Sequence, residues 1–114
     1  MLVKVLRAKI HRATVVQAEV DYAGSIAIDG DLMDAAGILP GECVLVADLA
    51  DGVRFETYAL QGRRASGIIC VNGAAARLVK VGDKVIIMAF AYVTPEEAAG
   101  IQPRIVLVDD GNRF

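Results

Sequence analysis

The sequence predicts one mainly β domain, a small closed or nearly closed β-barrel. Its 114 residues are 55% hydrophobic, with 15 Val and 10 Ile against three Phe, three Tyr and no Trp. Side chains branched at Cβ favour extended backbone, so this composition favours strands over helices. The apolar runs are short and separated by turn signals, a pattern typical of barrels and sandwiches. A chain of this length has room for one hydrophobic core, so we expect residues 1–114 to form a single domain.

The first part of the chain predicts two strand regions and a short helix. Residues 2–22 alternate between apolar and polar side chains, which is the period of a strand with one buried face. Residues 26–28 resume a strand after a Gly-Ser pair. The next segment breaks this pattern, and we expect a helix over residues 32–36, with Asp31 as its N-cap and Gly37 at its end.

The rest of the chain predicts further strands and a second short helix. Asp51-Gly52 is a strong hairpin signal, and Thr94 followed by Pro95 is a typical helix start. A buried strand is expected after the turn at residues 82–83. The remaining strands are expected at residues 43–49, 53–60, 67–71 and 104–108. Six to eight short strands with two short helical segments therefore predict a barrel, whose strand order the pattern does not specify.

Charge and composition exclude several classes of partner. The net charge is −2, so no overall basic field favours nucleic acid or an anionic membrane. The longest apolar run, residues 85–93, is about half the length of a membrane-spanning helix. Cys43 and Cys70 lie in apolar, strand-like runs, and we interpret them as buried small hydrophobes in a protein of the reducing cytoplasm.

The available side chains exclude most metal and nucleotide chemistry. One histidine, His11, and two distant cysteines do not make a zinc site, and no glycine-rich phosphate loop is present. A serine triad through His11 would be expected to carry a Gly-x-Ser-x-Gly elbow, which the chain lacks. We therefore expect no metal. A sparse set of polar groups on an aliphatic frame remains: Lys9, His11, Tyr22, Ser25, Arg54, Thr57, Tyr58 and Asn72.

Each of these groups has a structural as well as a functional interpretation. Arg54 and Tyr58 are four residues apart, so a regular strand points both to one face, which could simply be exposed. Residues 71–76 are either a tight turn or a row of accessible backbone N–H groups that binds a carboxylate. Gly24-Ser25, taken alone, is most simply a turn.

In combination, six segments resemble the pyruvoyl-dependent aspartate 1-decarboxylases in order and spacing: KIHRATV, YAGSIAID, DAAGILPGE, RFETYAL, IICVNGAAA and VGDKVIIMAF. The resemblance covers nearly the whole chain and is far more specific than any one motif. It implies a small double-psi β-barrel, assembled as a homotetramer with active sites between neighbouring subunits. It also implies a cytoplasmic enzyme that makes β-alanine for pantothenate and coenzyme A biosynthesis. Some family members need a maturation factor.

In this family a Gly-Ser bond is the processing site, which corresponds here to Gly24–Ser25. The resemblance implies that Ser25 Oγ attacks the Gly24 carbonyl, that the ester eliminates, and that hydrolysis leaves a pyruvoyl group and ammonia. The chain would be divided into residues 1–24 and 25–114. The pyruvoyl ketone would form a Schiff base with L-aspartate, in place of pyridoxal phosphate, while CO2 leaves. We expect glycine at position 24 to permit a close, strained approach of the backbone.

The resemblance also implies roles for the other residues. Tyr58 would be the proton donor, and Thr57 would act in both processing and substrate contact. Arg54 and Lys9 would hold the substrate carboxylates. The further substrate-binding positions are Asn72, Gly73, Ala74 and Ala75, and the supporting positions are His11 and Tyr22. Adjacent Thr57 and Tyr58 would face opposite sides of a regular strand, so either the strand bulges or one of them serves a neighbouring subunit.

Two alternative functions remain beside this one. If the reaction stopped at cleavage, Ser25 would keep its amine as an N-terminal nucleophile, as in amidohydrolases, and no ammonia would be lost. A small barrel that binds DNA is supported only by the basic residues at positions 4, 7, 9 and 12. The net charge and the low aromatic content oppose it.

Overall fold

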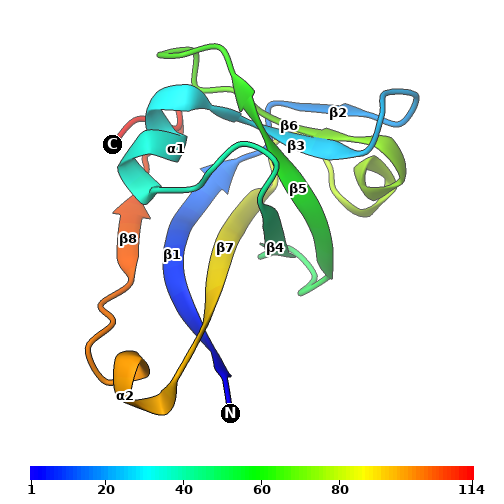
Figure 1. The fold of residues 1–114 in the computed structure, drawn as a ribbon. Helices are drawn as coiled ribbons and strands as arrows, with labels where there is room; N and C mark the ends of the chain where they lie inside the picture. The colour runs from blue at the N-terminus through cyan, green and yellow to red at the C-terminus, as the bar shows by residue number, and fades with distance from the viewer.

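The structure, a computed structural model, describes residues 1–114 as a β-barrel with two short α-helices and one 3-10 helix (Figure 1). The prediction of a mainly β barrel with two short helices is confirmed, while the double-psi connectivity stays a prediction. The 3-10 helix was not predicted. The elements are β1 (Val3–Thr14), β2 (Gln17–Glu19), β3 (Ser25–Asp29), α1 (Gly30–Ala36), β4 (Cys43–Asp48), β5 (Arg54–Gly62), β6 (Ile69–Asn72), η1 (Gly73–Leu78), β7 (Lys84–Val93), α2 (Pro95–Ala98) and β8 (Arg104–Leu107).

The strands form a ring. They pair in the order β2-β6-β3-β5-β4-β7-β1-β8. Because β2 follows β1 almost directly, one continuous segment pairs first with β7 and then with β6. A backbone hydrogen bond of 3.0 Å from Val16 N to Ile69 O continues this pairing across the junction. The ring is therefore closed through β1 and β2, and β8 lies beside β1 as a parallel edge strand.

The ring encloses an aliphatic core, and the strand register decides which side chains enter it. One inward row across β1, β7, β4 and β5 consists of Ile10, Ile87, Val46 and Phe55. The neighbouring row faces outward and consists of Lys9, Met88, Leu45 and Glu56. The alternation predicted from the sequence therefore places the polar side chains of β1 and β5 on the outer face of the barrel.

The start of α1 differs from the prediction. Its N-cap is Asp29, whose Oδ1 accepts a 2.9 Å hydrogen bond from Asp31 N, so the prediction of Asp31 as cap is wrong. The reason is that Asp29, 3% exposed, ends β3 and collects several backbone N–H groups at once. Burial opposes its ionisation, but these donors, led by Gly67, hold the pKa of Asp29 below its usual range. Gly37 ends the helix with φ of 74°, as predicted.

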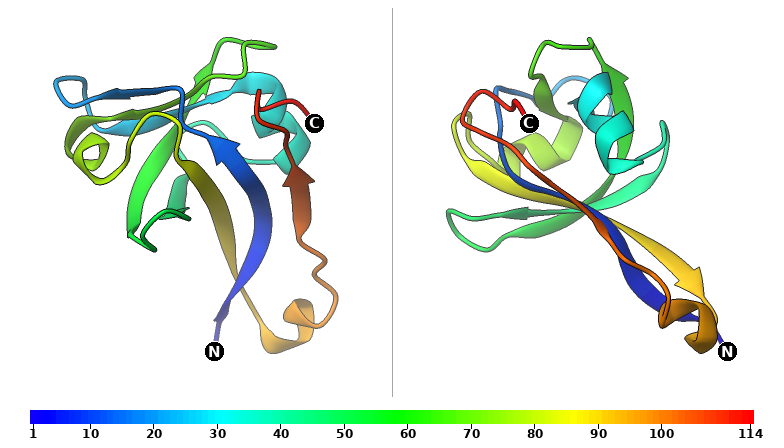
Figure 2. Two further views of the ribbon diagram at one scale, coloured as in Figure 1. Left: turned by 180° about the vertical axis from the view of Figure 1, so that it is seen from behind. Right: turned by 90° about the vertical axis from the view of Figure 1, so that its left-hand side faces the viewer.

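An arm extends from the barrel. It is built from β1, β7 and β8 and ends in α2, close to the N-terminus (Figures 1 and 2). Thr94 caps α2 as predicted, since its hydroxyl accepts a hydrogen bond from Glu97 N at 3.2 Å. The arm makes the molecule elongated, with dimensions of 42 × 26 × 24 Å. None of the helices combines the length and the apolar character needed to cross a membrane.

Candidate active site

The hydroxyl of Ser25 is buried and held by two side-chain hydrogen bonds. Ser25 begins β3, is 1% exposed, and pairs with Asn72 of β6 in antiparallel register. Asn72 Nδ2 donates to Ser25 Oγ at 3.1 Å, and Oγ donates to the carbonyl of Ala23 at 3.3 Å. The strand pairing therefore fixes a serine oxygen directly beside the Gly24–Ser25 peptide bond.

The backbone approaches this bond most closely at Gly73. A Cβ on Gly73 would lie 2.6 Å from Gly24 Cα and 3.3 Å from the carbonyl oxygen of Tyr22, whose own side chain is 59% exposed. Gly73 also has φ of 75°, which favours glycine. A Cβ on Gly24 would meet nothing within 4 Å, and Gly24 does not have a left-handed φ. Packing against the rest of the chain therefore requires glycine at Gly73 and not at Gly24, while the expectation that Gly24 permits the approach of Ser25 Oγ stays a prediction.

Gly73 begins η1, which contains the predicted substrate-binding backbone. Asn72 is at the N-cap position but makes no side-chain cap bond, because its acceptor Oδ1 is engaged with the Cys70 thiol. Ala74 is exposed and Ala75 is half-buried. The first turn of η1 therefore lies next to Gly24 with backbone N–H groups that the cap residue does not occupy.

β5 passes beside β3 with an unbroken register. One residue before the first residue pair of this parallel ladder, Ser25 is level with Tyr58, and one further back Gly24 is level with Thr57. The pairing of β5 with β4 is also continuous across Thr57 and Tyr58, so there is no bulge. The two side chains therefore face opposite sides of the strand: Thr57 is half-buried toward the core, and Tyr58 is 41% exposed on the outer face.

The predicted cationic residues lie away from Ser25. Arg54 shares the outer face with Tyr58, as predicted, but is about 13 Å from it along the strand at roughly 3.3 Å per residue. Lys9 and His11 are on β1, which β5, β4 and β7 separate from β3. In the other direction round the ring only β6 lies between, because β2 continues β1 and pairs with β6; neither Lys9 nor His11 is hydrogen-bonded to Ser25. His11 Nδ1 is buried without a hydrogen-bond partner.

Cys70 is a site residue that the sequence interpretation missed. Interpreted as a small hydrophobe, it is indeed buried at 5% exposure, but its thiol donates to Asn72 Oδ1 at 3.1 Å. The two residues are two apart in β6 and share one face, which is the signal that could have identified the contact. Burial, together with the carboxylate of Glu19, raises the pKa of the Cys70 thiol, so that it is a donor at neutral pH.

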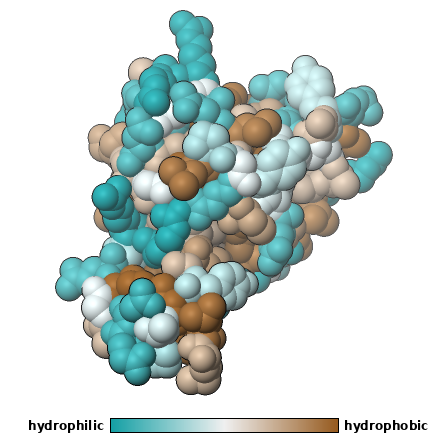
Figure 3. All heavy atoms as spheres, in the orientation of Figure 1, coloured by the Kyte–Doolittle hydropathy of each residue, from teal (hydrophilic) through white to brown (hydrophobic).

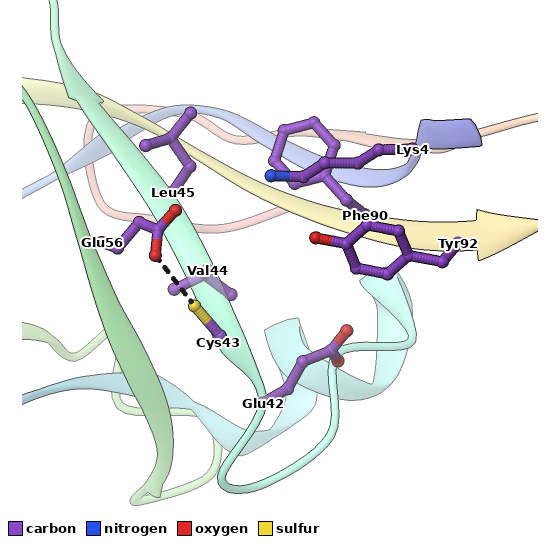
Figure 4. Close-up of a pocket in the computed structure, with 8 residues that line it drawn as sticks. All are labelled: Lys4, Glu42, Cys43, Val44, Leu45, Glu56, Phe90 and Tyr92. Carbon is purple, nitrogen blue, oxygen red and sulfur yellow. Dashed lines mark hydrogen bonds between the residues drawn. The ribbon is translucent and has the colours of Figure 1, made fainter. Parts of the chain in front are cut away.

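A separate pocket of about 250 Å³ lies on the outer face, where the arm joins the barrel (Figure 4). It contains none of the predicted site residues. In it the Cys43 thiol donates to Glu56 Oε2 at 3.7 Å. The prediction that Cys43 is buried is wrong, because it pairs with outward-facing Tyr58 and is exposed on the outer face. Its lining mixes acidic, basic and apolar side chains, namely Lys4, Glu42, Cys43, Val44, Leu45, Glu56, Phe90 and Tyr92. No group of three His, Cys, Asp or Glu side chains in the chain is arranged to hold a metal ion.

Fold and site together define a small β-barrel protein with one buried serine after a glycine, held by an amide on the neighbouring strand. The family model described as aspartate decarboxylase matches residues 1–114, and the chain belongs to this family. The resemblance drawn from the sequence segments is thereby confirmed.

Curated relatives match over the whole chain. The aspartate 1-decarboxylase of Caldicellulosiruptor saccharolyticus is 59% identical over 114 residues, which cover 100% of this chain and 89% of the relative. That of Lactiplantibacillus plantarum is 58% identical, with coverage of 100% and 88%. That of Phenylobacterium zucineum is 57% identical, with coverage of 100% and 97%.

Proposed function

We propose that this chain decarboxylates L-aspartate to β-alanine and CO2 by means of a pyruvoyl group made from its own Ser25. One observation carries the proposal: in a chain of the aspartate decarboxylase family, a buried serine hydroxyl directly after Gly24 accepts a hydrogen bond from Asn72. The relatives' name supports the substrate, and the surroundings of Ser25 suit the formation of the group.

The cleavage needs only the chain and water. Ser25 Oγ attacks the carbonyl carbon of Gly24 and loses its proton, while the Ser25 nitrogen leaves as an amine, so an amide becomes an ester. Loss of the Ser25 α-hydrogen then expels the Gly24 carboxylate and leaves a dehydroalanine, which water converts to a ketone with release of ammonia. Serine is required because the same oxygen is first the nucleophile and then the leaving group. The products are residues 1–24 and 25–114.

Neighbouring groups support this cleavage. Asn72 Nδ2 donates to Ser25 Oγ and can stabilise the negative charge that develops there. Thr57 is level with Gly24 in the strand register, and we assign its hydroxyl as a donor to the Gly24 carbonyl when that oxygen becomes an oxyanion. Gly73 keeps η1 packed against Gly24 without an intervening side chain.

The same neighbours suit the decarboxylation. Once formed, the ketone supplies an electrophile for the substrate amine and an acceptor for the electrons released with CO2. We assign Tyr58, level with Ser25 on β5, as the donor of the proton that the product carbon needs. Asn72 and the backbone N–H groups of Gly73, Ala74 and Ala75 are assigned to a substrate carboxylate, because free N–H groups bind carboxylates well.

We assign the remaining substrate contacts to a neighbouring subunit. Lys9 and Arg54 face outward, so their charges are available to a second copy of the chain. Apolar side chains also gather between the barrel and the end of the arm, as a surface that packs on another subunit would require (Figure 3). A homotetramer with active sites between subunits accounts for both features, with His11 and Tyr22 as supporting residues.

The wider role follows from the same proposal. The β-alanine would enter pantothenate and coenzyme A biosynthesis in the cytoplasm, where the two free cysteines, Cys43 and Cys70, would stay reduced. A maturation factor is a further partner, and processing of the purified chain with and without cell extract tests for it.

An intact-mass spectrum of the purified, denatured protein tests the proposed function. We expect a fragment that ends at Gly24 and a second that begins at residue 25 and is lighter by one ammonia than a fragment with N-terminal serine. The expected activity is CO2 release from L-aspartate. A second fragment that keeps its amine would instead support the N-terminal nucleophile. A chain that stays intact after prolonged heating and with cell extract would contradict the pyruvoyl group.

A further inference from the structure

Three buried side chains form a hydrogen-bonded series across β6 and β3. The Cys70 thiol donates to Asn72 Oδ1 at 3.1 Å, and Asn72 Nδ2 donates to Ser25 Oγ at 3.1 Å. The three residues are 5%, 8% and 1% exposed, so water does not compete freely for these groups. The thiol is therefore two hydrogen bonds away from the oxygen that has to attack Gly24.

The thiol has a specific effect on the orientation of the amide. An asparagine side chain has an acceptor end and a donor end, and a half-turn about its last bond exchanges them. In the observed orientation the thiol donates to Oδ1, and Ser25 Oγ, whose own proton goes to the Ala23 carbonyl, accepts from Nδ2; the reverse orientation would set the amide oxygen against the lone pairs of Oγ. No other hydrogen bond holds Oδ1.

We infer that Cys70 is a positioning residue for the cleavage of Gly24–Ser25, because its thiol keeps the NH2 group of Asn72 directed at Ser25 Oγ. In this orientation Oγ accepts a hydrogen bond, which stabilises the negative charge it develops as its proton leaves. In the reverse orientation a carbonyl oxygen would face Oγ and oppose that charge. The inference rests on the proposed function, since it concerns the same cleavage.

A purely structural Cys70 makes a different prediction. A small buried hydrophobe is replaceable by any side chain of similar volume, whereas a positioning thiol is replaceable only by another donor. Cys70→Val keeps the volume but removes the donor, and Cys70→Ser keeps a donor. Cys70→Ala, which removes the donor without adding volume, covers the case in which the branched side chain perturbs β6. Cys43→Ser on exposed Cys43 is the matched control for loss of a thiol.

The experiment measures the rate of cleavage of freshly purified, uncut precursor at constant temperature by intact mass, together with the melting temperature. We expect Cys70→Val and Cys70→Ala to cleave about tenfold more slowly than the unmodified chain, as expected for loss of a buried hydrogen bond at the reacting group. Cys70→Ser should cleave within about twofold of the unmodified rate, even if its melting temperature falls. Cys43→Ser should be unchanged.

A second pair of variants tests whether the thiol acts through Asn72. In an Asn72→Ala background, Cys70→Val should change the remaining cleavage rate little, because the amide that the thiol orients is gone. An equal loss in both backgrounds would overturn the inference, as would cleavage of Cys70→Val at the unmodified rate. An unmodified chain that never cleaves would overturn the proposed function and this inference together. A chain that cleaves regardless of residue 70 would overturn the inference alone.

Discussion

At the scale of single residues, Gly24 and Gly73 are glycines for different reasons. A Cβ added to Gly24 would meet nothing within 4 Å beyond its chain neighbours, so packing against distant residues does not require glycine there. Gly73 has both a left-handed φ and Gly24 where its Cβ would be. The close packing around the processing bond therefore depends on a residue that lies far from that bond in the sequence.

We expect Gly73→Ala to slow the cleavage and to lower the free energy of unfolding well beyond the cost of its φ. The matched control is Gly41→Ala, which has φ of 83° and no atom within 4 Å of the added Cβ. The control should lose about 1 kcal/mol from backbone strain alone. Urea unfolding measures the stability of the two variants, and intact-mass kinetics measure their cleavage rates. Equal losses for the two variants would show that the contact with Gly24 is unimportant.

Asp48 is another residue whose surroundings come from distant parts of the chain. Its carboxyl group is buried in the barrel wall. It is 2% exposed, and its Oδ2 has no donor and faces the carboxylate of Asp83, with Asp51 nearby. Burial and the neighbouring Asp83 raise the pKa of Asp48 from 3.8 to about 6. Below about pH 6 the Asp48 carboxyl is therefore mostly protonated and can share its proton with Asp83.

This pair should make stability fall as the pH rises. The pKa of Asp48 is raised in the folded chain, so its contribution is fully present below about pH 4 and is lost as the pH passes through about 6. Asp48→Asn keeps an N–H donor for Asp83 and cannot ionise. We expect it to be more stable than the unmodified chain at pH 8 by on the order of 2 kcal/mol, and by about half as much at pH 5. Urea unfolding at both pH values measures the difference, and parallel pH profiles would contradict the shared proton.

At the scale of elements, β5 carries both Thr57 and Tyr58, to which we assign different chemical steps. Its regular pleat sends Thr57 inward at the level of Gly24 and Tyr58 outward at the level of Ser25. A bulge would have brought both to one side, but the pairing with β4 is continuous across Thr57 and Tyr58. The strand can therefore separate cleavage from decarboxylation between two adjacent residues.

We expect the two side chains of β5 to have separate effects. Thr57→Val, which removes only the hydroxyl, should slow the cleavage at least about tenfold, and Thr57→Ser should restore it. Tyr58→Phe should cleave normally and lose about a hundredfold in CO2 release. Intact mass and CO2 release measured on the same samples separate the steps. Failure of Tyr58→Phe to cleave would assign the phenol to processing instead.

At the scale of the whole molecule, the outer face of the barrel divides the predicted site. Ser25, Asn72 and Gly73 meet on β3, β6 and η1, whereas Lys9 is on β1, which three strands separate from β3 in one direction round the ring and β6 in the other. Our proposal that Lys9 serves the site of a neighbouring chain accounts for this separation.

This division predicts complementation between inactive chains. Ser25→Ala and Lys9→Ala should each be nearly inactive alone. Co-expressed in equal amounts, they should recover up to about a quarter of the unmodified activity, because random assembly gives that fraction of sites with both residues intact. CO2 release by the purified mixture checks this, with the two proteins mixed after separate assembly as the control. No recovery on co-expression would mean that Lys9 acts within its own chain or is not required.

Much of the fold could be predicted because its signals are local. The alternation in this segment correctly predicted that Arg54 and Tyr58 lie on the same face of one strand. Gly37 and Thr94 correctly predicted the end of α1 and the start of α2. Such signals act over a few residues, where the backbone period decides the direction of each side chain. The prediction of the N-cap of α1 was wrong because backbone N–H groups at residues 65–67, far away in the sequence, donate to the Asp29 carboxylate and hold it at the start of the helix.

The sequence by itself determined the strand-rich class, the outward polar faces and, through its family resemblance, the Gly24–Ser25 site. Only the tertiary structure decided what surrounds that site. Asn72 is hydrogen-bonded to Ser25, which is 47 residues away in the sequence, and Cys70 is hydrogen-bonded to Asn72. Gly73 packs on Gly24, and Asp83 faces Asp48. These contacts depend on closure of the ring and on the register between strands. No local pattern encodes either, because the pairing partners come together only when the core forms.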